Sequence, residues 1–167
     1  VPNDLAFLVG VRRRLSLPEG DRGPRAVVLV GGTAYVANYF SDTLAAVDVA
    51  SDYPRWRSIP LGPKIEADIV RKGESYFHDA DICFQGWQSC ASCHSSDARV
   101  DGLNWDNLND GIGNPKNAKS MLLAHQTPPS MALGVRASAY VAVRAGIKNS
   151  LFTVQPEEVA SSIDEYL

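Results

Sequence analysis

The chain has 167 residues, of which 45% are hydrophobic and 21% charged, and its formal net charge is −3. This composition is typical of a folded globular protein and excludes a disordered, collagenous or coiled-coil chain. Acidic residues outnumber basic ones, which argues against nucleic acid as a partner because no basic field is present to displace counterions from phosphates. No apolar run approaches the roughly 20 residues that a membrane-spanning helix needs.

Residues 1–62 predict a small antiparallel β-sheet. Short apolar runs alternate with turn signals such as Gly31-Gly32 and Ser41-Asp42, an arrangement typical of a meander of strands. The expected strands lie at 11–17, 25–30, 33–39, 43–49 and 55–59.

Residues 63–167 predict an all-α domain, so the fold class expected for the whole chain is α+β. The expected helices lie at 65–78, 117–124, 137–147 and 157–167. A long polar stretch at 95–117 separates the first two helices, and loops of this length are usually functional. The apolar side chains are few for a domain of this size, which suggests that a large apolar cofactor completes the core.

The motif Cys90-Ala-Ser-Cys-His94 carries the main functional signal. The pattern C-x-x-C-H is typical of covalent haem attachment, in which two thiols bond to the porphyrin and the histidine ligates the iron. A zinc site would need two further ligands at short spacing, and a redox dithiol would need a βαβ context, neither of which the flanking sequence offers. The sequence therefore predicts haem c bound through Cys90 and Cys93, with His94 as the proximal iron ligand.

The distal iron ligand is left open between two residues. Met131 follows Pro128-Pro129 in a rigid segment and is the preferred candidate, while His125 is the alternative. Met121 and Cys83 are interpreted as core side chains, because both occur in apolar surroundings.

Three resemblances to known families add to this interpretation. The stretch 30–49, with Tyr35-Val36-Ala37-Asn38 at its centre, resembles the repeat of YVTN-type β-propellers. A single blade cannot bury both of its faces, so the chain is expected to be a fragment of a larger protein. The helix with Gly73 and Phe77 is similar to one in small cytochromes c, where such a glycine lies against the C-terminal helix; this implies contacts with Ile163, Tyr166 and Leu167.

The run from 71 to 144 resembles the first haem domain of bacterial dihaem cytochrome c peroxidases and their methylamine-utilisation relatives. The matching segments include Ser89-Cys-Ala-Ser-Cys-His94, Asp101-Gly102, Asp110-Gly-Ile-Gly113, Asn117-Ala-Lys-Ser-Met121 and the Thr127-Pro-Pro segment that leads to Gly134-Val-Arg136. The chain departs from that family in having one C-x-x-C-H motif and no histidine at 108–113.

The predicted function is that of a monohaem c-type cytochrome domain, with a β-blade at 1–62 and a cytochrome c-like domain at 63–167. It would carry electrons to a redox partner protein, and a homodimer through the exposed blade is a further expected association. The alternative is a peroxidase-like enzyme that reduces hydrogen peroxide and needs a second haem or a partner. Because haem c is attached outside the cytoplasmic membrane, the expected location is the periplasm or surface of a bacterium.

Overall fold

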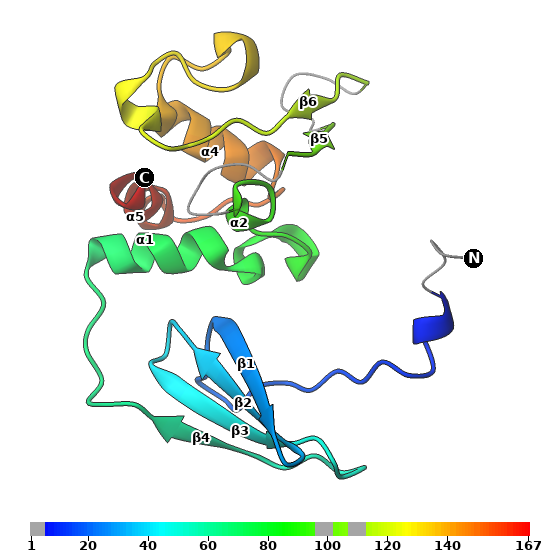
Figure 1. Cartoon of the computed structure of the whole chain (residues 1–167). Helices are drawn as coiled ribbons and strands as arrows, with labels where there is room; N and C mark the ends of the chain where they lie inside the picture. Colours follow the sequence, from blue (N-terminus) through cyan, green and yellow to red (C-terminus); the bar gives the residue numbers. More distant parts are fainter. Residues whose placement is uncertain (1–5, 96–101, 107–112) are drawn as a thin grey trace. The chain divides into compact units, whose positions relative to one another are not determined.

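A computed structural model describes residues 6–95, 102–106 and 113–167, and the chain divides into two compact units, 1–64 and 65–167 (Figure 1). The sequence analysis placed the boundary after residue 62. The first unit holds a β-sheet and the second holds the helices, so the predicted α+β class is confirmed.

The first unit is a four-stranded antiparallel sheet with the strand order β1-β2-β3-β4. The strands are β1 (Pro24–Val30), β2 (Thr33–Asn38), β3 (Thr43–Asp48) and β4 (Trp56–Pro60), preceded by the 3₁₀ turn η1 (Ala6–Leu8). Gly31 and Gly32 join β1 to β2 with φ of 55° and 89°, a left-handed conformation that glycine adopts without strain.

The strand expected at 11–17 is wrong, because this segment has no strand assignment among the described residues. Three consecutive arginines, 12–14, interrupt the alternation of apolar and polar side chains that a half-buried strand needs. Arg13 instead donates through its guanidinium to the carbonyl oxygens of Val49 (3.1 Å) and Ser51 (3.0 Å).

The carboxylate of Asp21 links three strands of the sheet. It accepts hydrogen bonds from Asn38 of β2 (3.0 Å), Thr43 of β3 (2.7 Å) and Ser58 of β4 (2.6 Å). Asn38 is 1% exposed, so its amide depends on partners within the protein. One carboxylate therefore accepts hydrogen bonds from three strands at one end of the sheet, while the Asn38 side-chain oxygen is buried without a hydrogen-bond partner among the described residues.

In the part of the second unit that the structure describes, four α-helices are joined by short connections. They are α1 (Ile69–His78), α2 (Cys90–Cys93), α4 (Ala139–Asn149) and α5 (Glu157–Tyr166). The connections include the 3₁₀ turns η2 (Ala80–Ile82), η3 (Phe84–Gly86), η4 (Ala124–Gln126) and η5 (Ala132–Gly134), and the paired strands β5 (Asn104–Trp105) and β6 (Lys116–Asn117). Asp68 caps α1 by accepting from the Arg71 amide at 2.8 Å, which explains why this helix begins four residues later than expected.

The helix expected at 117–124 is also wrong. Lys116 and Asn117 pair with Trp105 and Asn104 in the β5–β6 ladder, so the backbone at the start of this segment is extended. Leu123 then adopts a left-handed φ of 58°, which ends any right-handed helix. Among the described residues, no helix is long and apolar enough to span a bilayer.

Helices α1 and α5 cross in direct backbone contact at Gly73. A Cβ atom built on Gly73 would lie 1.8 Å from the Ser162 carbonyl oxygen and 3.0 Å from Tyr166 Cβ. The glycine implied by the cytochrome resemblance thus does contact the C-terminal helix, with Ser162 as its nearest neighbour. Phe77 of α1 and Ile163 of α5 are buried beside this crossing, at 0% and 1% exposure.

We predict that Gly73→Ala lowers the free energy of unfolding by about 3 kcal/mol, because the helices must separate to admit the methyl group. Gly146→Ala in α4 is the matched control, since its Cβ would meet no atom within 4 Å. Urea unfolding followed by circular dichroism measures both variants. Equal stabilities of the two would contradict the crossing.

We also predict that Asp21→Ala lowers the stability of the first unit by about 2 kcal/mol, since three hydrogen bonds to a charged acceptor are lost. Hydrogen exchange at the β2 and β3 amides reports this unit separately from the helices. Asp52→Ala, at an exposed aspartate, should leave the exchange rates unchanged. Similar rates in both variants would show that Asp21 does not hold the strands together.

Candidate functional site

The C-x-x-C-H motif forms the short helix α2. Ser89 and Ser92 form a reciprocal capping box, in which the Ser89 amide donates to Ser92 Oγ at 3.0 Å. The His94 amide donates to the Cys90 carbonyl at 2.9 Å and closes the turn. Cys90 and Cys93 are therefore one turn apart on the same side of the helix.

Hydrogen bonds fix the position of this motif against the end of α4. Gln88, which is 6% exposed, donates to the Ser150 carbonyl at 2.6 Å. The Phe84 amide donates to the Leu151 carbonyl at 2.8 Å, and Thr153 donates to the Ile82 carbonyl at the same distance. The segment before the motif is thus tied to the α4–α5 connection.

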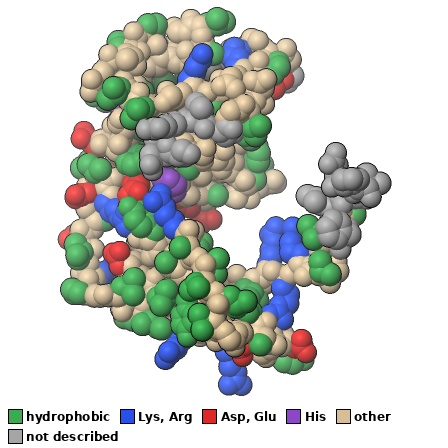
Figure 2. Space-filling view, in the orientation of Figure 1, with side chains coloured by type: hydrophobic (Ala, Val, Ile, Leu, Met, Phe, Trp, Pro, Cys, Tyr) green, Lys and Arg blue, Asp and Glu red, His purple; other side chains and the backbone are tan. Residues whose placement is uncertain are grey.

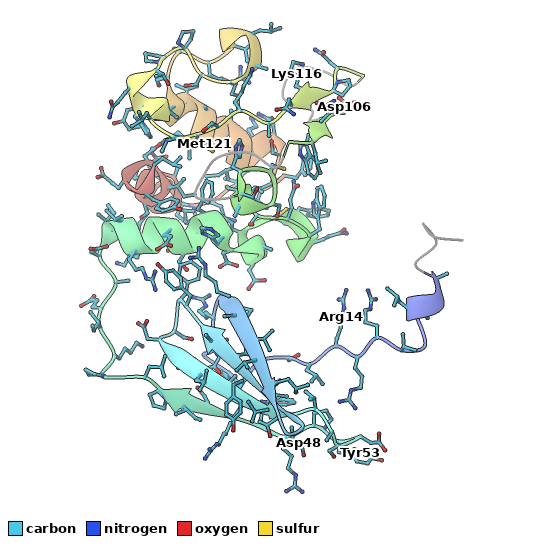
Figure 3. All side chains as sticks on the ribbon, viewed as in Figure 1. Arg14, Asp48, Tyr53, Asp106, Lys116 and Met121 are labelled. Atoms are coloured by element: carbon cyan, nitrogen blue, oxygen red, sulfur yellow. The ribbon has the colours of Figure 1, made fainter. Side chains whose placement is uncertain are left out.

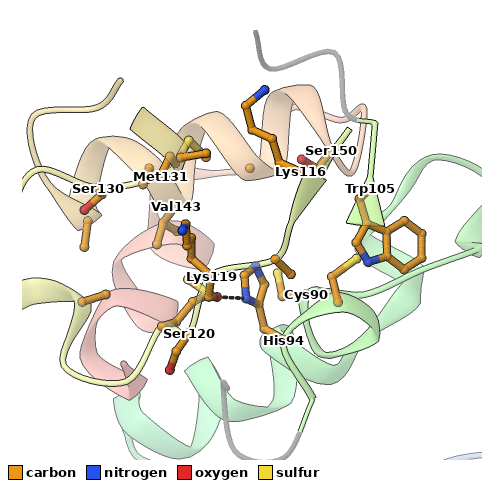
Figure 4. A pocket seen from close by; sticks show the side chains of 18 of the residues that line it. Cys90, His94, Trp105, Lys116, Lys119, Ser120, Ser130, Met131, Val143 and Ser150 are labelled. Atoms are coloured by element: carbon orange, nitrogen blue, oxygen red, sulfur yellow. Dashed lines mark hydrogen bonds between the residues drawn. The ribbon is translucent and has the colours of Figure 1, made fainter. Parts of the chain in front are cut away.

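A cavity of about 380 Å³ lies beside the motif (Figure 4). Its size is within the range of small-molecule and cofactor sites, which are mostly apolar with a few polar groups. Cys90, Cys93 and His94 line it, together with side chains from α1, α4 and α5. The apolar lining residues include Phe77, Met121, Met131, Val143, Ile147, Leu151 and Ile163.

The ring of His94 is oriented by a backbone carbonyl. Its Nδ1 lies 2.8 Å from the Lys119 carbonyl oxygen, the contact drawn as a dashed line in Figure 4. Because a carbonyl oxygen only accepts, Nδ1 carries the proton and the Nε2 lone pair is the one available to ligate a metal. Metal-ligating histidines characteristically donate their other ring N–H in this way.

Burial raises the pKa of the Cys90 thiol from 9.0 to about 12, and the neighbouring Cys93 and Cys83 act in the same direction. The Cys90 backbone opposes this with a hydrogen bond that lowers the pKa. The thiol is therefore protonated at neutral pH. Because the thiolate is the form that attacks electrophiles and binds metals, the protonated Cys90 thiol is poorly suited to either role.

The structure separates the two residues considered as distal ligands. Met131 lines the cavity, as does Met121, which is labelled in Figure 3. His125 is not among the residues that line this cavity. Its ring packs edge-on against Tyr140 with centroids 4.4 Å apart, and its Nε2 lies 3.5 Å from Asp164 Oδ1.

Asp164 contacts Arg144 as well as His125. Its other oxygen accepts from Arg144 Nη1 at 2.6 Å, and Arg144 Nε also donates to Glu157 at 2.9 Å. The side chain of Asp164 is 4% exposed, so a buried carboxylate connects the η4 segment to α4 and α5.

Cys83, interpreted from the sequence as a core residue, and Asp106 have structural roles. Cys83 is 4% exposed and belongs to the hydrophobic core of the second unit. Asp106 accepts from the Gly113 and Asn114 amides at 2.8 and 3.3 Å, which is a turn contact. In 6–95, 102–106 and 113–167, no group of three or more His, Cys, Asp or Glu side chains could hold a metal ion. The Asp110-Gly-Ile part of the segment used for the peroxidase resemblance lies outside the described residues.

The sequence analysis missed the Lys119 carbonyl as part of the site. A main-chain oxygen has no residue-type signal, and the segment that contains it was predicted to be helical. In a helix this carbonyl would accept from the residue four positions later rather than from His94.

Comparison with known proteins finds no matching family model. A stretch of 64 residues is 39% identical to hydrazine synthase subunit gamma of Kuenenia stuttgartiensis. The match spans 38% of this chain and 18% of that protein. A chain in a solved structure of Kuenenia stuttgartiensis hydrazine synthase, pressurised with 20 bar xenon, is similar in fold, with a TM-score of 0.54 at 24% identity. That similarity covers 62% of this chain and 37% of the other.

These findings correct the assignment made from the sequence. The sequence match is to hydrazine synthase subunit gamma and the structural match is to a chain of hydrazine synthase; neither is a dihaem cytochrome c peroxidase or a YVTN-type propeller protein. The functions drawn from the resemblance, a monohaem cytochrome electron carrier and a peroxidase-like enzyme, are overturned with it. The sequence already differed from the peroxidase family in two ways: it has a single C-x-x-C-H motif, and it has no histidine at 108–113.

The described residues nevertheless fit a covalently bound haem. The two thiols, the imidazole oriented by the Lys119 carbonyl and the apolar cavity lie together, and thiols and imidazole are the groups that hold haem c. The fit rests on this geometry and does not depend on the peroxidase resemblance.

We predict that Cys90 with a free thiol reacts with iodoacetamide about 1,000-fold more slowly at pH 8 in the folded chain than in urea, because three pKa units separate the two states. A Cys83→Ser/Cys93→Ser background confines the label to Cys90. The raised pKa also predicts how the free energy of unfolding depends on pH. The contribution of the Cys90 thiol is fully present below pH 9 and is lost as the pH rises towards 12, because the unfolded chain ionises first. Equal labelling rates in the folded and unfolded chains would contradict the burial of this thiol.

Proposed function

We propose that this chain is part of a subunit of a multi-subunit, hydrazine-forming complex. The support is the 39% identity over 64 residues to a subunit whose name places it in hydrazine synthase. The match covers 18% of that protein. It therefore supports a relationship for the shared stretch, and membership in the complex is proposed from that relationship. Protein partners are part of the same proposal.

We further propose that residues 65–167 are a helical domain that holds haem c. Cys90 and Cys93 would each add across one vinyl group, the sulfur bonding one vinyl carbon and the hydrogen passing to the other. His94 would ligate iron through Nε2 while its Nδ1 remains bonded to the Lys119 carbonyl. This hydrogen bond, at the edge of a cavity of about 380 Å³, is the observation that carries the proposal.

The candidates for the opposite face of the iron are Met131, preferred, and His125. Met131 already lines the cavity. His125 would first have to leave Tyr140 and Asp164, at the cost of a buried aromatic contact and a charged neighbour. A bound haem would supply an iron that binds small ligands or changes oxidation state, with the sixth ligand deciding between them.

The proposed location is outside the cytoplasmic membrane, in the periplasm or at the surface of a bacterium. This follows from the compartment in which haem c is attached and is part of the haem proposal.

The test of the haem site is the pyridine haemochrome spectrum of the full chain produced with a haem-attachment system. We expect haem that survives acid extraction, with the α band of a porphyrin whose two vinyl groups are saturated. Cys90→Ala and Cys93→Ala should each shift that band to longer wavelength, because one vinyl group stays conjugated. Cys83→Ala is the matched control and should leave the band in place.

Haem that is fully removed by acid extraction from the unmodified chain would overturn the covalent site. Identical bands in Cys90→Ala, Cys93→Ala and the unmodified chain would overturn the assignment of these two residues.

The complex is tested separately, by purifying the tagged protein from its own organism. The proposal predicts co-elution with further subunits and hydrazine formation by the eluted complex. A protein that elutes alone, with no such activity, would contradict the proposed subunit role without affecting the haem test.

A further inference from the structure

Asp164 is a buried carboxylate that takes no part in the haem site described above. Figure 2 shows acidic side chains (red) at the surface of the molecule, whereas the side chain of Asp164 is 4% exposed. Among the described residues it is the one Asp or Glu that is buried. A buried carboxylate needs charged or hydrogen-bonding partners to offset the loss of water, so its neighbours indicate its role.

The two carboxylate oxygens of Asp164 have different neighbours. Oδ2 accepts from Arg144 Nη1 at 2.6 Å, and Arg144 is held in turn by Glu157, to which its Nε donates at 2.9 Å. Oδ1 lies 3.5 Å from Nε2 of His125. The guanidinium therefore fixes one oxygen of the carboxylate and leaves the other beside the imidazole ring.

His125 and Asp164 each present a buried polar atom to the other. Both ring nitrogens of His125 and Oδ1 of Asp164 have no hydrogen-bond partner among the residues that the structure describes. Unpaired buried polar atoms are rare because they are unfavourable. A shift of roughly 0.5 Å brings Nε2 and Oδ1 to the usual N–H···O distance, so each is the partner available to the other.

His125 is kept from the cavity by the direction of its side chain and not by its place in the chain. Its neighbours Ala124 and Thr127 both line the cavity, whereas His125 does not. The His125 ring instead packs edge-on against Tyr140 of α4, with centroids 4.4 Å apart. A change in the orientation of the η4 turn would bring the imidazole to the cavity wall without unfolding a helix.

The backbone of the η4 turn is held by local contacts. The Ala124 amide donates to the Met121 carbonyl at 3.0 Å, and Leu123, with a left-handed φ of 58°, forms the bend immediately before the turn. The side chain of His125 reaches beyond this segment, to α4 and α5. Its contacts therefore tie the turn to the helices.

We propose that Asp164 is a positioning residue that decides which side chain reaches the iron face opposite His94. It retains His125 beside α4 and α5, and so leaves that face to Met131 or to a small ligand. The reason is competition, since an imidazole nitrogen that donates its proton to a carboxylate has no lone pair for iron. The inference rests on the haem c proposed above and concerns the sixth ligand of that haem.

The test compares variants of the full chain loaded with haem, by absorption spectrum and reduction potential. Asp164→Leu keeps the approximate shape of the side chain and removes both acceptors, so His125 loses its partner and should become the sixth ligand. The spectrum should change to that of low-spin iron with two imidazole ligands. Where Met131 is the ligand of the unmodified chain, the potential should also fall, because a methionine ligand raises it. Adding His125→Phe to Asp164→Leu should restore the original spectrum.

Arg144→Gln is the matched control, because it disturbs the same cluster and leaves the Asp164 carboxylate beside His125. Its spectrum should equal that of the unmodified chain, and so should the spectrum of His125→Phe alone. The proposal would be overturned if Asp164→Leu left the spectrum unaltered or if His125→Phe alone changed it. The same change in Arg144→Gln as in Asp164→Leu would also overturn it, since loosening of the cluster would then be a sufficient cause.

Labelling of the haem-free chain with diethyl pyrocarbonate gives a readout that does not depend on haem. Mass spectrometry of the peptides should show His125 modified several-fold faster in Asp164→Leu than in the unmodified chain. The rate at His78, which unfolding would raise as well, should not change. Equal rates at His125 in the two chains would contradict its retention by Asp164.

Two further arms keep the outcomes separate. If Asp164→Leu lacks the native circular dichroism spectrum, Asp164→Asn, which removes the charge and keeps the volume, replaces it in both measurements. An unmodified chain that takes up no covalent haem overturns the haem proposal, and the labelling rates at His125 then decide whether Asp164 retains this residue.

Discussion

The backbone contact between α1 and α5 at Gly73 is the constraint on which the helical unit depends. It places the Ser162 carbonyl where any larger residue at position 73 would have its Cβ. Phe77 and Ile163, buried on either side of the crossing, are also part of the cavity wall. The same contact that holds the two helices together therefore builds one side of the site. The motif helix α2 then completes the cavity from a segment fixed to the end of α4 by Gln88 and Phe84.

The two units are stabilised in different ways. The helical unit has a continuous buried cluster around Phe77, Val143, Ile147 and Ile163. The sheet has little buried side-chain volume, and its order depends on the strand ladder and on the polar contacts of Asp21. Among the described residues of the sheet, the apolar side chains of β1 are mostly exposed, and only Asn38 and residues 45–47 are buried.

Local sequence patterns predicted most of the elements. Short apolar runs with turn signals such as Gly31-Gly32 located β1 to β4, and the helices expected at 65–78, 137–147 and 157–167 agree with α1, α4 and α5 to within four residues. The failures occurred where long-range pairing overrides local preference: β6 forms because Asn104 and Trp105 are opposite it. The cysteines and histidine were recognisable from their spacing. The Lys119 carbonyl was not, because a main-chain acceptor has no signature in the sequence.

The family assignment failed for a different reason. Short motifs such as C-x-x-C-H report a local chemistry, and that chemistry occurs in proteins of many functions. The geometry around His94 fits that local chemistry, while the sequence match is to hydrazine synthase subunit gamma and not to the peroxidase family.

The most direct test of the central claim is the intact mass of the full chain after production with a haem-attachment system, measured under denaturing conditions. The account predicts the mass of the polypeptide plus one haem. The mass of the polypeptide alone would contradict the assignment of Cys90, Cys93 and His94 as a haem-attachment site.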